Sequence, residues 1–209
     1  MSSETGRLSA SSVFGLAAVA ALLAVGLIAC GSKTDAQLAN DALQSGLEAQ
    51  AAGQLDRAAA FYNDCLKHEP KSKVCLYDIG TVEQAQGHPV QAEAEYRLAL
   101  ASDPNFAPAI FNLAIIRADA GSFDEAIGLY RQYLKLVPKN AAAHFNLGLL
   151  LNRTGDTAGG STEIAAALAL DPSLRSRLPS ASPPVSSGTP AAAPSTIPAL
   201  SLSPQPSGT

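Results

Sequence analysis

Histidine and cysteine are the residues of this 209-residue chain best suited to chemistry, and neither is arranged for it. The histidines are expected in a loop, in a turn and on a helix, where structural roles are the simplest interpretation: His68, His88 and His144. The cysteines show neither a CxxC pair nor the Cys/His spacing of a zinc site: Cys30, Cys65 and Cys75. No HExxH, P-loop, GxGxxG or GxSxG pattern occurs. The sequence therefore predicts no catalytic residue, no metal site and no cofactor.

Charge and composition limit the classes of function that this chain can have. The formal net charge is −4 and the sequence pI is about 5.3, so the chain has no basic footprint for nucleic acid. There is no tryptophan and only 5% of residues are aromatic, which favours helices packed through alanine. Four carboxylates are interpreted as solvated helix faces: Glu93, Glu95, Asp124 and Glu125. We expect a protein without enzymatic activity; an enzyme with an unrecognised site is the remote alternative.

The N-terminal region contains a long apolar run. Residues 8–32 form a stretch of 25 residues without a charged side chain. A helix of that length reaches roughly 37 Å, enough to cross ~30 Å of hydrocarbon. The run is therefore expected to be a membrane helix or a secretion signal.

The end of this run, Leu27-Ile28-Ala29-Cys30-Gly31, resembles the lipobox of bacterial lipoproteins. The resemblance implies a signal over residues 1–30, diacylation of Cys30 and cleavage just before it. An uncleaved transmembrane anchor and an ordinary cleavable signal stay open as alternatives. We expect membrane attachment at the cell membrane, with the rest of the chain on the extracytoplasmic side.

Four sets of residues recur every 34 positions after this region. They are Gly46/Gly80/Ala114/Gly148, Gly53/Gly87/Gly121/Gly155, Ala58/Ala92/Ala126/Gly160 and Pro70/Pro104/Pro138/Pro172. The two sets of small residues suit the close crossing of paired helices. The glycine set suits a left-handed cap at the end of the first helix. The proline set stops the second helix of each pair.

This pattern resembles the tetratricopeptide repeat family, most closely over Lys73–Asn140. The resemblance implies an all-α, right-handed solenoid of four helix hairpins after a linker at 31–38. The expected repeats are residues 39–72, 73–106, 107–140 and a degenerate 141–174. Gly159 and Gly160 weaken the last helix, since each glycine costs ~1 kcal/mol relative to alanine. Because little chain remains to cover this repeat, we expect it to be frayed or covered by a partner.

The C-terminal region, residues 179–209, contains no charged residue and is rich in Pro, Ser and Ala. Such a segment cannot bury enough apolar surface to offset its ordering entropy, so a disordered tail is expected.

Cys65 and Cys75 form an even pair if Cys30 carries lipid. In the solenoid that the resemblance implies, they lie on adjacent helices in an oxidising compartment, where a disulfide is possible. Closing a ring of about 11 residues would stabilise the fold by roughly 2–3 kcal/mol. The alternative is two small buried residues at packing positions.

The resemblance also implies a partner-binding groove lined by the first helices of the hairpins. The fifth and sixth residues of each repeat typically point into it: Leu43-Gln44, Tyr77-Asp78, Phe111-Asn112 and Phe145-Asn146. Arg153 is the cation expected near them. These aromatic and amide side chains suit an apolar, weakly charged peptide. Alternatively, the aromatic rings pack between neighbouring helices.

The expected function is a membrane-tethered scaffold for a protein or peptide partner. An envelope assembly chaperone with a lipid on Cys30 is the alternative.

Overall fold

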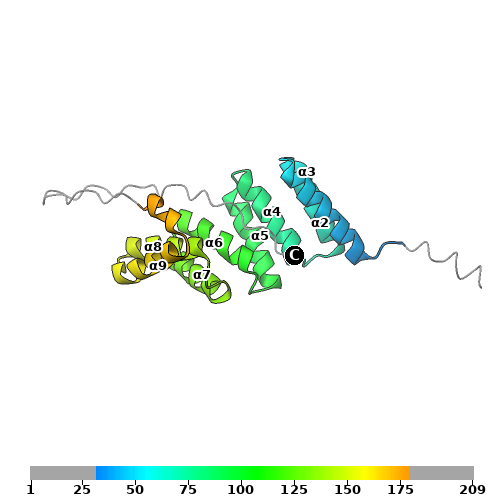
Figure 1. Ribbon diagram of the computed structural model, residues 1–209. Helices are drawn as coiled ribbons and strands as arrows, with labels where there is room; N and C mark the ends of the chain where they lie inside the picture. Colours follow the sequence, from blue (N-terminus) through cyan, green and yellow to red (C-terminus); the bar gives the residue numbers. More distant parts are fainter. Residues whose placement is uncertain (1–31, 179–209) are drawn as a thin grey trace, which may run out of the picture.

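The computed structural model describes residues 32–178, in which helices are joined by short turns. Eight α-helices in this range are followed by a short 3₁₀ helix, η2 (Figure 1). Their bounds are α2 Asp35–Ala51, α3 Leu55–His68, α4 Lys73–Ala85, α5 Pro89–Ser102, α6 Ala107–Asp119, α7 Phe123–Leu136, α8 Ala141–Thr154, α9 Thr157–Leu170 and η2 Pro172–Arg177.

The helices are arranged as four hairpins stacked in sequence order. α2 packs with α3, α4 with α5, α6 with α7, and α8 with α9. The second helix of each hairpin also packs against the first helix of the next, so the four pairs follow one another along the molecule (Figure 1). This arrangement confirms the all-α architecture of repeated hairpins that the 34-residue period predicts.

Small residues let the two helices of a hairpin approach closely. Gly46 lies under the ring of Tyr62, and Gly80 under the ring of Tyr96. Ala58 and Ala92, on the facing helices, are fully buried. The two sets of small residues therefore occupy the helix crossings, as the repeat pattern predicts.

The turn inside each hairpin requires a left-handed backbone. Four glycines adopt a φ between 71° and 98° in these turns: Gly53, Gly87, Gly121 and Gly155. L-residues with a Cβ are strained in this region, which explains why glycine recurs there every 34 residues.

The first helix begins earlier than the expected linker at 31–38 allows. Thr34 caps α2: its side chain accepts from the backbone N of Gln37, whose side chain accepts from the backbone N of Thr34. This capping box satisfies two N–H groups and starts the helix at Asp35. Residues 35–38 are thus helical, and the linker prediction is wrong for them.

The last hairpin keeps a regular backbone. Asp156 caps α9 by accepting from the backbone N of Gly159 at 2.9 Å, so the two glycines lie in the first turn, where intrahelical hydrogen bonds are fewest. The short helix η2 then places Leu174 in a cluster with Phe145 and Ala167. α9 is helical from Thr157 to Leu170, and Gly160 and Ala167 are its only buried residues; the predicted fraying stays a prediction.

Two predicted segments lie outside the described residues: the signal or anchor at 1–30 with Cys30, and the tail at 179–209. Within residues 32–178, no helix is long and apolar enough to span a bilayer.

Candidate partner-binding surface

The aromatic side chains expected to line a groove belong instead to the core. Tyr77, Phe111 and Phe145 are each at most 2% exposed. Phe111 contacts the rings of Tyr130 and Tyr133, with centroids 5.8 and 4.9 Å away. The prediction of an exposed aromatic ladder at these three positions is therefore corrected: the rings fill the space between neighbouring helices, as the alternative held.

The short polar residues beside those rings are also buried. Asp78, Asn112 and Asn146 are at most 3% exposed. Asn112 Nδ2 donates to the hydroxyl of Tyr96 at 3.2 Å, and Asn146 Nδ2 donates to that of Tyr130 at 3.0 Å. These amides serve contacts between hairpins and do not face an open groove.

The tyrosine hydroxyls also bind amides within their own hairpins. Tyr62 donates to Oε1 of Gln50 at 2.6 Å, and Tyr96 donates to Oε1 of Gln84 at 3.0 Å. These hydrogen bonds link the two helices of a hairpin at its partly buried edge and, through Tyr96 and Asn112, continue to the next hairpin. We call this network the tyrosine–amide ladder; its members are Gln50, Tyr62, Gln84, Tyr96, Asn112, Tyr130 and Asn146.

Asp78 occupies the ladder position that asparagine holds in the next two hairpins. Its Oδ2 atom has no hydrogen-bond partner within residues 32–178. Burial raises the pKa of the Asp78 carboxyl to about 7. Burial also raises the pKa of the Tyr62 hydroxyl, and the nearby Asp78 charge adds to this. A carboxylate is a poor occupant of this position unless it carries a proton.

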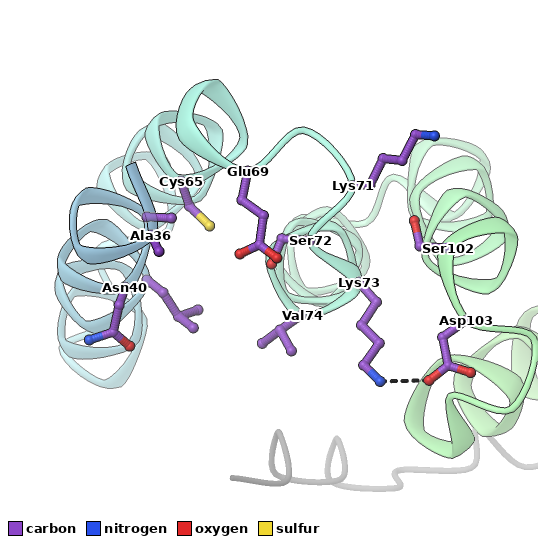
Figure 2. Close-up of a pocket in the computed structure, with 12 residues that line it drawn as sticks. Ala36, Asn40, Cys65, Glu69, Lys71, Ser72, Lys73, Val74, Ser102 and Asp103 are labelled. Atoms are coloured by element: carbon purple, nitrogen blue, oxygen red, sulfur yellow. Dashed lines mark hydrogen bonds and ion pairs between the residues drawn. The ribbon is translucent and has the colours of Figure 1, made fainter. Parts of the chain in front are cut away.

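An open hollow of about 480 Å³ lies between the first helices of the first two hairpins. Asn40 projects from α2, while Lys73 and Val74 project from the start of α4 (Figure 2). Leu43 and Val74 supply apolar lining, and Asn40 is an exposed polar group on the rim. Lys73 binds Asp103 after α5, with Nζ and Oδ2 2.6 Å apart.

Leu43 is the single groove prediction that lines this hollow. Gln44, its neighbour, is exposed but is not among the residues that line it. The signal for the hollow was the run of small residues in α2, since Ala36 and Ala39 leave space where larger side chains would fill it.

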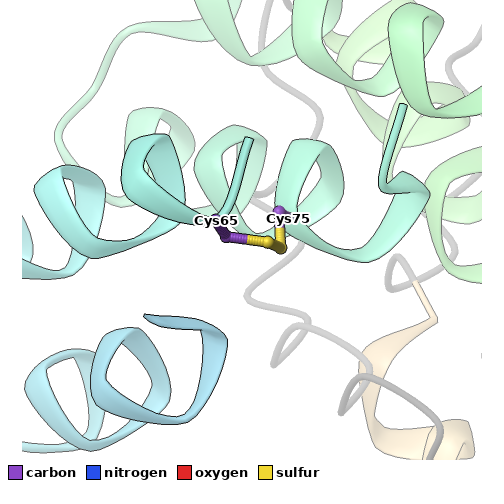
Figure 3. The surroundings of a disulfide bond; sticks show 2 residues. All are labelled: Cys65 and Cys75. Atoms are coloured by element: carbon purple, nitrogen blue, oxygen red, sulfur yellow. A yellow bond between two sulfur atoms is a disulfide. The ribbon is translucent and has the colours of Figure 1, made fainter. Parts of the chain in front are cut away.

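In the structure a disulfide joins Cys65 and Cys75, one of the two alternatives that the sequence leaves open for this pair (Figure 3). The two Cα atoms are 6.4 Å apart, and neither residue is more than 1% exposed. The bond joins the end of α3 to the start of α4, and so ties the first hairpin to the second. Cys65 also lines the hollow, so the bond braces its wall.

Arg153 is exposed but lies far along the stack, on α8 of the fourth hairpin. Its guanidinium lies 4.7 Å from the ring centroid of Phe123, a cation–π contact. The structure does not bring Arg153 together with the hollow.

Two carboxylates expected on solvated faces form ion pairs between hairpins. Glu93 of α5 binds Arg97 and Arg117, and Glu125 of α7 binds the same two arginines. Burial opposes ionisation of Glu93, but the hydrogen bonds from Arg97 and Arg117 outweigh it and lower the Glu93 pKa. The solvated-face interpretation is wrong for Glu93 and Glu125.

The histidines are engaged in pairs. His144 Nδ1 lies 2.6 Å from Glu163 Oε2, and its Nε2 lies 3.0 Å from the carbonyl oxygen of Pro138. His68 and His88 each contact one carboxylate. Over residues 32–178, no group of three or more His, Cys, Asp or Glu side chains is placed to hold a metal ion.

Repeated hairpins with this register define an α-helical repeat protein. Residues 77–141 and 111–175 each match the family described as Tetratricopeptide repeat. Together the matches cover residues 77–175, from within α4 to within η2, and the first hairpin lies outside them. No match was found among curated proteins.

Solved structures show the same fold. A crystal structure of MamA aligns with a TM-score of 0.60 at 18% identity, covering 66% of this chain and 81% of that chain. Pseudomonas aeruginosa pilF aligns with a TM-score of 0.59 at 24% identity, covering 66% and 63%. This chain thus spans less than two thirds of the pilF structure. The first TPR of Spaghetti (RPAP3), bound to an HSP90 peptide, gives a TM-score of 0.55 at 22% identity, covering 59% and 98%.

Proposed function

We propose that this protein is a non-catalytic interaction scaffold that binds an extended segment of a partner protein in the hollow between α2 and α4. The observation that carries the proposal is the hollow itself: an open space of about 480 Å³ with apolar lining, polar groups at its edge and a braced wall. Sites of this kind bind ligands through shape and a few polar contacts.

The lining indicates the chemistry of the segment. Leu43 and Val74 offer apolar surface for one small aliphatic side chain. The Asn40 amide can both donate to and accept from a peptide backbone. Glu69 and Lys71 at the edge carry opposite charges, and Lys73 is paired with Asp103. A segment of low net charge fits this surface better than a strongly acidic or basic one.

The fold supports the same function. Helical repeats present extended surfaces to other proteins because each hairpin adds area without changing the architecture. The first TPR of Spaghetti (RPAP3) was solved bound to an HSP90 peptide, and this supports peptide binding by a similar hairpin stack.

The test is selection of binders from a random 12-residue peptide display library, followed by calorimetry with the purified chain. Asn40→Arg places a long charged side chain at the hollow and is expected to weaken selected peptides by at least about tenfold, ~1.4 kcal/mol. Asn63→Arg, on the exposed side of α3, is the matched control and should bind as the unsubstituted protein does. Failure to select any peptide, or equal affinity of both variants, would reject the proposal.

The proposal includes attachment to the membrane through residues 1–30, with the repeats on the extracytoplasmic side. The lipobox-like sequence ending at Cys30 supports attachment, and the Cys65–Cys75 disulfide supports an oxidising compartment. Palmitate should label the chain in cells and label the Cys30→Ala variant far less. Equal labelling of both would remove the lipid from the proposal.

A further inference from the structure

The three junctions between hairpins share one arrangement with a single exception. A tyrosine on the second helix faces the residue 16 positions later, on the first helix of the next hairpin. At the second and third junctions that residue is an asparagine, which donates to the tyrosine hydroxyl at 3.2 Å for Tyr96 and 3.0 Å for Tyr130. At the first junction the pair is Tyr62 and Asp78.

Replacing an amide with a carboxyl changes the hydrogen bonds that the side chain at this position can donate. The asparagine Nδ2 is always a donor, whereas a carboxyl donates only when it is protonated. Asp78 is 3% exposed, and its Oδ2 is buried with no hydrogen-bond partner within residues 32–178. An ionised Asp78 is therefore a buried charge without compensation.

Nothing that packs around Asp78 in the described part of the chain supplies a positive charge. The titratable groups that sense it are Tyr62 from α3, Tyr77 on α4 and Tyr96 from α5. The ladder amides nearby are neutral: Gln50 on α2 and Asn112 on α6. Burial acts on Asp78 unopposed by any cation.

We infer that Asp78 is a pH-sensitive coupling between the first and second hairpins, which is tight when the carboxyl holds its proton and weak when it ionises. In the protonated state Asp78 is neutral, like the asparagines at the other two junctions. When it ionises, an uncompensated charge lies between α3, α4 and α5, and the packing there is weakened. The disulfide from Cys65 to Cys75 keeps α3 and α4 connected, so ionisation loosens the junction without separating the hairpins.

The direction of the effect follows from the two states of the chain. In the unfolded chain Asp78 ionises near the ordinary aspartate pKa of ~4. In the folded protein its pKa is raised to about 7, because burial disfavours the charge. The folded state therefore holds one more proton between about pH 4 and pH 7, and stability falls as the pH rises through that window.

The first test compares urea unfolding of the full chain and its Asp78→Asn variant from pH 4.5 to 8.5. The folding equilibrium constant of the unsubstituted protein, relative to that of the variant, should fall by up to about tenfold per pH unit below pH 7 and level off above it. Asp41→Asn, the same change at an exposed position, should keep the unsubstituted profile. Parallel profiles for the unsubstituted protein and Asp78→Asn would overturn the inference.

A second test reports on the junction itself and does not need a folded variant. The carboxyl ¹³C resonance of Asp78 should titrate near pH 7 in the unsubstituted protein. Hydrogen-exchange protection factors in α4, corrected for intrinsic rates, should drop across the same range, while those in α8 should stay constant. A carboxyl that titrates near pH 4, or protection that falls equally in α4 and α8, would refute the coupling.

Discussion

Gly80 of α4 lies directly against the ring of Tyr96 of α5. A Cβ placed on Gly80 would be 2.6 Å from Cε1 and 2.8 Å from Cδ1 of that ring, which is itself fully buried. The ring cannot move away without opening the hairpin, so the close approach of the two helices depends on this glycine.

Gly80→Ala should therefore destabilise the protein, although alanine is the better helix former. Overpacking of this kind costs about 1–3 kcal/mol, more than the ~1 kcal/mol gained in helix propensity. Gly128→Ala is the matched control, because Gly128 is also helical but has nothing within 4 Å of its added Cβ. Urea unfolding should show Gly80→Ala less stable and Gly128→Ala more stable than the unsubstituted protein. A stabilised Gly80→Ala would mean that the crossing tolerates a wider spacing.

A separate prediction concerns the stability effect of substituting a glycine in the turn of a hairpin. Gly87 has φ +82° and no atom within 4 Å of an added Cβ, so backbone strain is the only penalty there. Gly87→Ala should lower the free energy of unfolding by about 1–2 kcal/mol, whereas Gly87→Asn should cost less. Thermal unfolding of both variants measures the difference. Equal stabilities of the alanine and asparagine variants would argue against a left-handed turn.

The disulfide should stabilise the folded protein by reducing the conformational entropy of the unfolded chain. Replacing Cys65 and Cys75 with alanine together should lower the free energy of unfolding by roughly 2–3 kcal/mol. In the folded protein the bond should resist mild reductants, because both residues are at most 1% exposed. Thiol counting under denaturing conditions without reductant should find neither cysteine free. Two reactive thiols would show that the bond does not form.

The tyrosine–amide ladder should show coupling between its members. Asn112→Ala removes the donor to Tyr96 and should cost about 1–3 kcal/mol. Tyr96→Phe removes the hydroxyl, and the double variant should be more stable than the sum of the single losses predicts, by at least ~0.5 kcal/mol. A double-mutant cycle on urea unfolding measures this. Additive losses would indicate that the 3.2 Å contact carries little energy.

Much of the fold could be predicted from the sequence because each repeated residue has one dominant physical role. A glycine such as Gly87 is required by backbone geometry, and a small residue such as Gly80 by helix separation, so both constraints recur every 34 residues. Neither constraint depends on distant parts of the chain, so the spacing of these residues was enough to predict the helix hairpins.

The binding surface was harder to predict. The repeat positions of Tyr77 and Phe111 were expected to face a groove, but exposure depends on the size of neighbouring side chains. Phe106 packs edge-on against Tyr77 at 5.5 Å, and Tyr133 packs against Phe111. Phe106 precedes α6 and Tyr133 lies on α7, so a pattern read along the helix of Tyr77 or Phe111 does not reveal these neighbours. The hollow likewise depends on the small side chains of Ala36 and Ala39 in α2, which leave the space between α2 and α4 unfilled.

The ladder also sets the order of the hairpins. Tyr96 and Tyr130 each present a hydroxyl to the hairpin that follows, and Tyr62 holds the same position in the first hairpin, but the fourth hairpin has Ile164 there. A hairpin inserted after it would find no oxygen for its asparagine. The units are thus not interchangeable modules: a rearranged gene could duplicate the third hairpin in tandem, because its copy would place an asparagine opposite Tyr130. A copy of the second would place an aspartate opposite Tyr96, and the fourth offers no tyrosine hydroxyl to a hairpin that follows it.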